Sequence, residues 1–283
     1  MRKFALLVGI VAVAASQPAG AWWLTGHTVI NRTGVATLPP EVPDFLRRQI
    51  NWIGARSIAP DSWRDATEPS LRAIEIPNHI WYFEALPAMT EVPRSRNDFM
   101  VLAGDPRRIG TLPYATIETY ERLKVAFRIW RGLHARREDT SFIEMDAAFL
   151  AGWLGHYVGD GAMPLHTSAH HNGWAGENPK NYTRDRDIHG RFEGEFVDLI
   201  ELTEKDITAR LPPAQAFADP FAAFLTFLDR SHARVEQVYA LEQRHAFEDA
   251  TNLEARELVY TCTADAAGML RDLIYSAWTA SGL

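Results

Sequence analysis

Residues 142–162 read FIEMDAAFLAGWLGHYVGDGA, and this stretch decides the fold. The segment is apolar nearly all the way round a helix, which is typical of a helix in the middle of a bundle rather than on its surface. Gly161 and Pro164 mark its end. His156 and Asp160 lie inside it, four residues apart. A histidine and a carboxylate in a buried helix need a compensating partner.

The flanking segments also have helical periodicity. Residues 113–137 carry apolar side chains every three or four residues, separated by charges. Further helices are expected at residues 41–54, 187–203, 215–244 and 251–279. Residues 86–112 and 167–186 are long irregular segments, which are usually functional in a compact domain. Because no succession of alternating polar and apolar runs indicates a sheet, we predict an all-α, single-domain, multi-helix bundle.

The N-terminus has the pattern of an export signal. Arg2 and Lys3 precede an apolar run at residues 4–15, and Ala19-Gly20-Ala21 forms a small-residue cleavage site. We expect residues 1–21 to be removed, leaving residues 22–283 as a secreted or periplasmic monomer. The apolar run is too short to span a bilayer, and no later segment offers the roughly 20 apolar residues that a transmembrane helix needs.

Charge and cysteine content narrow the protein class. The chain of 283 residues has a net charge of −7, and loss of the export signal leaves 27 basic against 36 acidic side chains. Such an acidic balance disfavours a basic nucleic-acid scaffold. Cys262 is the only cysteine, so no internal disulfide can form. A hydrophobic core or a bound metal must therefore stabilise the exported fold.

Two histidine–carboxylate pairs have the spacing of metal ligands. His156 and Asp160 form one pair, and His189 and Glu193 form the other. Side chains four residues apart on a helix project from the same face, so both members can bind one ion. A solvated ion pair is the simpler interpretation of such spacing alone, but burial of the first pair favours a metal. His166 follows closely after that pair.

These residues lead to a family resemblance. The string HYVGDGAMPLH at residues 156–166, followed by HGRFE at residues 189–193, resembles the zinc-ligand core of the superfamily that contains bacterial zinc-dependent phospholipase C and the fungal single-strand-specific zinc nucleases. Mature chains of that superfamily begin with a tryptophan whose amino nitrogen and carbonyl oxygen bind zinc. The expected cleavage leaves Trp22 first, in WWLTGH at residues 22–27, and the motifs APDSWR at 59–64 and PNHIWYFE at 77–84 supply further matches.

The resemblance implies three zinc ions. It assigns one ion to Asp61, His79, His156 and Asp160, a second to His166, His189 and Glu193, and a third to the Trp22 backbone, His27 and Asp160. Nitrogen and carboxylate ligands without thiolate suit catalytic zinc. We expect Asp61 also to orient the attacking water, and Arg64 to contact the phosphate. The implied activity is hydrolysis of phosphoric ester bonds.

Two substrates and one non-catalytic role remain open. Glu193 and the missing disulfide resemble the phospholipase branch, whereas Arg64, three residues after Asp61, resembles the nuclease branch. The base-recognising aspartate of the nucleases has no match after His79. We therefore predict a phospholipase C-like phosphodiesterase that acts on a phospholipid or similar small diester. A single-strand-preferring nuclease is the first alternative, and a secreted zinc-binding protein without turnover is the second.

Several candidate residues also have simpler interpretations. Trp22 could be an apolar anchor, Asp61 an N-cap, and Arg64 half of a surface ion pair with Asp65 or Glu68. Outside the matched positions, His170 and His171 are expected to be loop residues near the pocket, with metal binding as the lesser alternative. His134, His232 and His245 are expected to be solvated, and Cys262 to lie in the core.

Overall fold

The computed structural model describes residues 22–282, and over this range the chain is helical and contains no strand. The all-α prediction is confirmed; the expected export signal lies outside the described residues. In chain order the helices are α1 (Trp23–Ala36), α2 (Phe45–Arg48), α3 (Ile50–Arg56), α4 (Ala59–Ser62), α5 (Pro69–Asn78), η1 (Phe83–Ala85), α6 (Arg96–Ala103), η2 (Pro106–Arg108), α7 (Leu112–Ala135), α8 (Ser141–Ala162), η3 (Pro164–Thr167), α9 (Ile188–Gly190), η4 (Arg191–Glu195), α10 (Phe196–Leu199), α11 (Glu204–Thr208), α12 (Pro220–His232), α13 (Val235–Glu242), η5 (Ala246–Glu248) and α14 (Leu253–Ala280).

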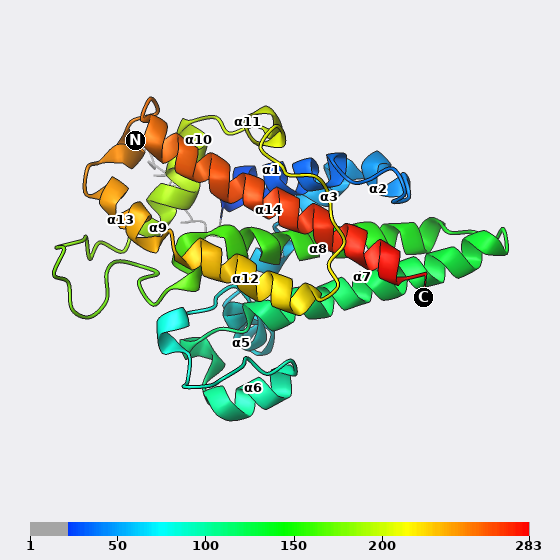
Figure 1. Ribbon diagram of the computed structural model, residues 1–283, viewed down its shortest axis with the longest axis horizontal. Coiled ribbons are helices and arrows are strands. Elements are labelled where there is room, and N and C mark those ends of the chain that lie inside the picture. Colours follow the sequence, from blue (N-terminus) through cyan, green and yellow to red (C-terminus); the bar gives the residue numbers. More distant parts are fainter. Residues whose placement is uncertain (1–21, 283) are drawn as a thin grey trace, which may run out of the picture.

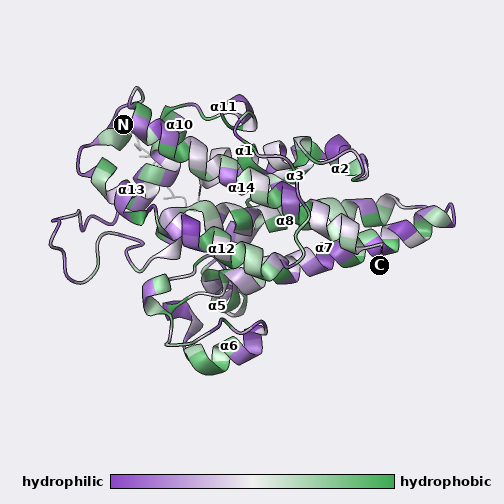
Figure 2. Ribbon diagram, viewed as in Figure 1, coloured by the Kyte–Doolittle hydropathy of each residue, from purple (hydrophilic) through white to green (hydrophobic). Residues whose placement is uncertain are grey.

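Helix α8 is the centre of the bundle, as its composition predicts. It packs against α7, α14, α3 and α1, and most of its side chains from Ala151 to Ala162 are buried. Figure 1 shows α14 running across the molecule in front of α8, with α5 and α6 together below α12. Cys262 is buried on α14, as expected. Most helices carry both polar and apolar residues along their length, as amphipathic helices around a core do (Figure 2).

Several expected helix boundaries are wrong. The expected helix at 41–54 is broken into α2 and α3, and the expected helix at 215–244 is broken between α12 and α13. The expected irregular segment 86–112 contains α6. Helix α1 is missing from the prediction because its sequence, WLTGHTVINRTGVA, is rich in Gly and Thr, which are weak helix formers. Its packing against α14 and α3 overrides that propensity.

Two glycines of α8 let α1 lie directly against it. A Cβ atom at Gly155 would stand 2.0 Å from Asn31 Oδ1, and one at Gly159 would stand 2.7 Å from His27 Nδ1. Any larger residue at these positions would push α1 away. The close approach of the two helices therefore brings His27 next to Asp160.

No helix within residues 22–282 combines the length and the apolar character needed to cross a bilayer.

Candidate metal centre

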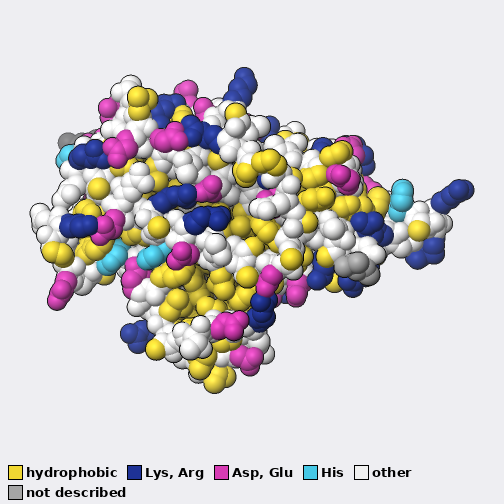
Figure 3. All heavy atoms as spheres, in the orientation of Figure 1, with side chains coloured by type: hydrophobic (Ala, Val, Ile, Leu, Met, Phe, Trp, Pro, Cys, Tyr) yellow, Lys and Arg dark blue, Asp and Glu magenta, His cyan; other side chains and the backbone are white. Residues whose placement is uncertain are grey.

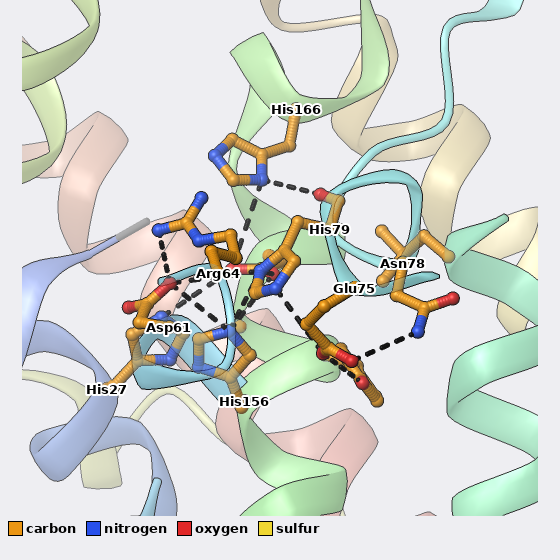
Figure 4. Close-up of polar contacts among 12 residues, drawn as sticks. His27, Asp61, Arg64, Glu75, Asn78, His79, His156 and His166 are labelled. Atoms are coloured by element: carbon orange, nitrogen blue, oxygen red, sulfur yellow. Dashed lines mark hydrogen bonds and ion pairs between the residues drawn. The ribbon is translucent and has the colours of Figure 1, made fainter. Parts of the chain in front are cut away.

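The candidate ligands meet at the C-terminal end of α8, although they come from distant parts of the sequence. Helix α8 carries His156 and Asp160. The other side chains come from α1 (His27), α4 (Asp61), the end of α5 (His79), η3 (His166) and the continuous α9–η4 segment (His189 and Glu193). All are buried except Asp61, whose side chain is 15% exposed. Figure 4 shows His27, Asp61, His79, His156 and His166 converging from their separate elements.

The first ligand group consists of Asp61, His79, His156 and Asp160. His79 Nδ1 lies 2.8 Å from Asp160 Oδ2 and 3.0 Å from His156 Nε2. Asp61 Oδ1 lies 3.8 Å from His79 Nδ1 and 3.7 Å from His156 Nε2. Zinc with bonds near 2.0–2.1 Å holds tetrahedral ligand atoms about 3.3 Å apart. The four side chains therefore have the separations that one such ion requires.

Asp160 faces this group with one oxygen and His27 with the other. Its Oδ1 lies 3.5 Å from His27 Nε2. Both ring nitrogens of His27 are buried without a hydrogen-bond partner among the described residues, although the ring stacks on His156. The two oxygens of Asp160 can thus serve two adjacent ions, as a bridging carboxylate does.

The second group contains His166, His189 and Glu193. His166 Nε2 lies 3.1 Å from His189 Nε2, and Glu193 Oε2 lies 2.8 Å from His189 Nε2. Glu193 lies in η4, a single π-helical turn, a feature often found at functional sites. The structure adds His171, which has a ring nitrogen within 4.8 Å of one on His166 and one on His189.

Hydrogen bonds at the far ring nitrogens fix the orientation of these histidines. His166 Nδ1 donates to the His79 carbonyl at 2.6 Å, and His189 Nδ1 lies 3.2 Å from the His171 carbonyl. The backbone N–H of Trp81 donates in return to the His166 carbonyl at 2.9 Å. Since Nδ1 carries the proton in both rings, two Nε2 lone pairs point at each other across 3.1 Å. This arrangement is repulsive unless a cation lies between them.

The charges of the centre also call for cations. Asp61, Asp160 and Glu193 lie close together, and Arg64 is the guanidinium that faces them. Burial raises the pKa of Glu193 well above its usual value, and the charges of Asp61 and Asp160 raise it further. Both oxygens of Glu193 are buried without a hydrogen bond among residues 22–282. The donor set and its unpaired atoms fit metal ions.

Two of the histidines are poised as neutral ligands, whereas for His79 burial alone would lower the pKa but the carboxylates of Asp160 and Glu75 raise it above its usual value. Burial lowers the pKa of both His156 and His189 to about 4. For Asp160, burial alone would raise the pKa, but its interactions with the surrounding histidine rings hold it well below its usual value. Neutral imidazole and ionised carboxylate are the forms that bind metal.

Arg64 lies inside the centre, where it pairs with Asp61. Its Nη2 donates to Asp61 Oδ1 at 2.5 Å, and its side chain is 18% exposed (Figure 4). The i,i+3 spacing of Asp61 and Arg64 across the end of α4 brings the two groups together. Arg64 therefore brings a positive charge to the most exposed ligand.

The side chain of Trp22 is an anchor, as its simpler interpretation predicts. It is fully buried, and its Nε1 donates to the Gly159 carbonyl at 2.8 Å, next to Asp160. The same position brings the residue close to the ligand group. Zinc binding by its backbone atoms stays a prediction.

Glu75 is a functional candidate that the sequence analysis missed. Its Oε1 accepts a hydrogen bond from Tyr157 Oη at 2.5 Å and lies 3.5 Å from His79 Nε2, the ring nitrogen that faces away from the ligand group. The carboxylate is buried and can orient His79. The sequence does contain an indication of this role, because Glu75 and His79 have the same four-residue spacing as the two histidine–carboxylate pairs of the sequence analysis.

A cavity of about 510 Å³ adjoins the centre on the far side of Glu75, between α5, α7 and α8. Its walls include the side chains of Trp63, Leu71, Phe149, Trp153 and Tyr157. The cavity is thus mainly apolar and aromatic, with the Glu75 carboxylate at its inner end.

The remaining aromatic and histidine residues have mostly structural contacts. Trp81 is fully buried and packs on Phe99, which removes it from the residues available to a substrate. His134 stacks on Trp130, and His245 is exposed. His232 is only 29% exposed and lies 3.1 Å from the Thr167 carbonyl, so it is less solvated than expected.

No protein-family model matches the chain, and a search of curated proteins finds no match either.

Proposed function

We propose that the protein is a zinc-dependent hydrolase of phosphodiesters. The observation that supports this most strongly is the buried carboxylate of Asp160, one oxygen of which faces His79 in the first ligand group while the other faces His27. Ligand sets made only of imidazole and carboxylate are typical of catalytic zinc. The sequence resemblance to the zinc-dependent phospholipase C and nuclease superfamily points to the same chemistry. As that resemblance implies, Asp61, His79, His156 and Asp160 would hold one ion, His166, His189 and Glu193 a second, and Trp22, His27 and Asp160 a third.

Zinc at such residues would supply Lewis acidity and a hydroxide at neutral pH. Asp61 is the most exposed carboxylate of the group, and its Oδ2 can accept a hydrogen bond from the attacking water and orient it. Arg64 holds its guanidinium beside Asp61, where it can bind a phosphate oxygen as negative charge develops. Burial keeps His156 and His189 neutral and excludes bulk water from the ligand groups.

Two features favour a phospholipid or similar small diester over single-stranded nucleic acid. The net charge of −7 disfavours a polyanion. Large apolar side chains are exposed on α5 and α6, namely Leu71, Ile74, Val101 and Leu102. Figure 3 shows hydrophobic side chains gathered below α12, over α5 and α6. Because α5 also carries Glu75 and leads into His79, this apolar surface lies beside the centre and could contact a lipid surface.

The test is a parallel assay of the mature protein beginning at Trp22. Elemental analysis should find up to three zinc ions per chain. The zinc-loaded protein should hydrolyse phosphatidylcholine vesicles and a bis-aryl phosphate diester faster than single-stranded DNA or RNA, and a chelator should abolish turnover. Preference for single-stranded nucleic acid would support the nuclease alternative, whereas bound zinc with no turnover on any substrate would support the non-catalytic alternative.

Two carboxylate variants separate metal binding from chemistry. Asp160→Asn should lose the most zinc, because it removes the carboxylate shared by the group around Asp61 and the proposed site at His27. Asp61→Asn should reduce turnover more than zinc content. Asp146→Asn, an exposed position on the same helix as Asp160, is the matched control and should change neither. Equal loss of zinc and turnover in Asp61→Asn would contradict a role for Asp61 beyond ligation.

A further inference from the structure

His171 lies against the second ligand group although no sequence argument favours it as a ligand. Its ring centroid lies 4.1 Å from that of His189 and 5.1 Å from that of His166. One ring nitrogen from each of the three residues falls within 4.8 Å of the other two. The three imidazoles thus form one group, contributed by η3, the following loop and α9.

The hydrogen bonds of His171 match those of the neighbouring candidates. Its Nδ1 lies 3.0 Å from the Leu165 carbonyl, just as Nδ1 of His166 and of His189 each face a carbonyl. A carbonyl can only accept, so Nδ1 carries the proton and the Nε2 lone pair remains available. Metal-binding histidines are usually oriented by such a bond from the second ring nitrogen. The backbone carbonyl of His171 also accepts from His189, so the loop is fixed in this position.

We propose that His171 is a fourth protein ligand at this site: its ring joins His166 and His189 in one group, beside Glu193, which contacts His189 and His166. The proposal rests on the proposed function only in requiring that the centre binds metal. Three imidazoles and one carboxylate give four protein ligands, which is the coordination of a closed site. Activation of water would then belong to the group around Asp61 and Asp160, and the ion held by His171 would contribute charge and structure.

The neighbouring His170 provides a matched control. Its ring stacks on Trp174 at a centroid distance of 3.8 Å, and its Nδ1 accepts a hydrogen bond from the backbone N–H of Ala175. Two adjacent histidines of one loop therefore have opposite tautomers and different surroundings.

The first measurement is the set of stepwise zinc affinities of the full mature chain, from competition with a chromophoric chelator. His171→Ala should weaken one zinc affinity by at least about tenfold, because even the outer partners of ligating histidines contribute about 10- to 100-fold. His170→Ala should leave every affinity unchanged. Cobalt(II) bound to the wild type should show the intense visible absorption of four-coordinate nitrogen–oxygen sites, reduced in His171→Ala.

A second measurement needs no variant and guards against misfolding. Carbethoxylation of the wild-type protein, mapped by tandem mass spectrometry, should modify His171 in the metal-free protein and spare it when zinc is bound, while His170 reacts equally in both. Equal reactivity of His171 in the two states, or unchanged zinc affinities in a folded His171→Ala, would overturn the assignment and leave the proposed function intact. A wild-type protein that binds no metal would overturn both.

Discussion

Replacing Glu75 by glutamine tests whether the carboxylate behind His79 positions this ligand. The change preserves size and removes the charge that faces His79 Nε2 at 3.5 Å and accepts the Tyr157 hydroxyl at 2.5 Å. Hydrogen bonds to charged groups contribute about 1.5–3 kcal/mol and neutral ones about 0.5–1.5 kcal/mol, so about 1–1.5 kcal/mol should be lost per bond. The Tyr157 bond alone gives about 1–1.5 kcal/mol, or about tenfold, which is the lower end of the roughly 10- to 100-fold loss of metal affinity typical of outer-partner variants; loss of the ion pair with His79 adds to it.

The assay is the zinc affinity of the group that contains His79, measured by chelator competition, with thermal unfolding of the metal-free protein as the second readout. Glu144→Gln is the matched control, because Glu144 is a half-buried carboxylate on α8 that accepts hydrogen bonds from Trp130 and Thr140 far along the helix from the ligands. The control should reduce stability without changing zinc affinity. A zinc affinity of Glu75→Gln within twofold of the wild type would refute the positioning role.

Three further predictions follow from the same centre. Arg64→Ala should lower turnover on every diester at unchanged zinc content; an unchanged rate would show that Arg64 does not bind the phosphate. One extra residue ahead of Trp22 should weaken one zinc affinity more than Trp22→Phe does, and the reverse order would argue against zinc binding by the Trp22 backbone. Trp22→Phe should instead lower the free energy of unfolding by about 1–2 kcal/mol, because it leaves the Gly159 carbonyl unpaired. The pKa values of His156 and His189 are lowered to about 4 by burial, so below pH 6.5 the unfolded chain binds protons that the fold excludes. Stability of the metal-free protein should therefore fall between pH 6.5 and about 4, by up to about 1.4 kcal/mol per pH unit for each histidine, and a flat urea-unfolding midpoint over this range would contradict their burial as neutral groups.

The sequence predicts structure and site residues best where a single segment shows both the helical period and the burial of the residues concerned. The apolar run around His156 and Asp160 predicts both the central helix and its ligand pair, because period and burial are encoded in one segment. Helix α1 escapes prediction because its stability comes from partners distant in the sequence. Its contact with α8 depends on the absence of side chains at Gly155 and Gly159, which no pattern within α1 reveals.

Residues around the candidate ligands are also hard to predict, because their roles depend on contacts with distant parts of the chain. Glu75 precedes His79 by four residues. This spacing indicates a positioning role only because the structure shows that Nε2 of His79 faces the Glu75 carboxylate. His170 and His171 are adjacent, and the sequence gives no reason to favour one of them over the other as a metal ligand. The backbone path of the loop gives the two rings different surroundings: His170 stacks on Trp174, whereas His171 lies against His189.

His79 belongs to both ligand groups at once, through different atoms. Its ring faces Asp160, while its carbonyl holds the His166 ring, and the backbone of Trp81 bonds back to His166. An ion that immobilises either group therefore reduces the conformational entropy that the other group still has to lose. Such thermodynamic linkage is reciprocal, so each ion should raise the affinity for the other. With limiting zinc, the protein should then divide into empty and fully loaded molecules, with few partly loaded ones between them.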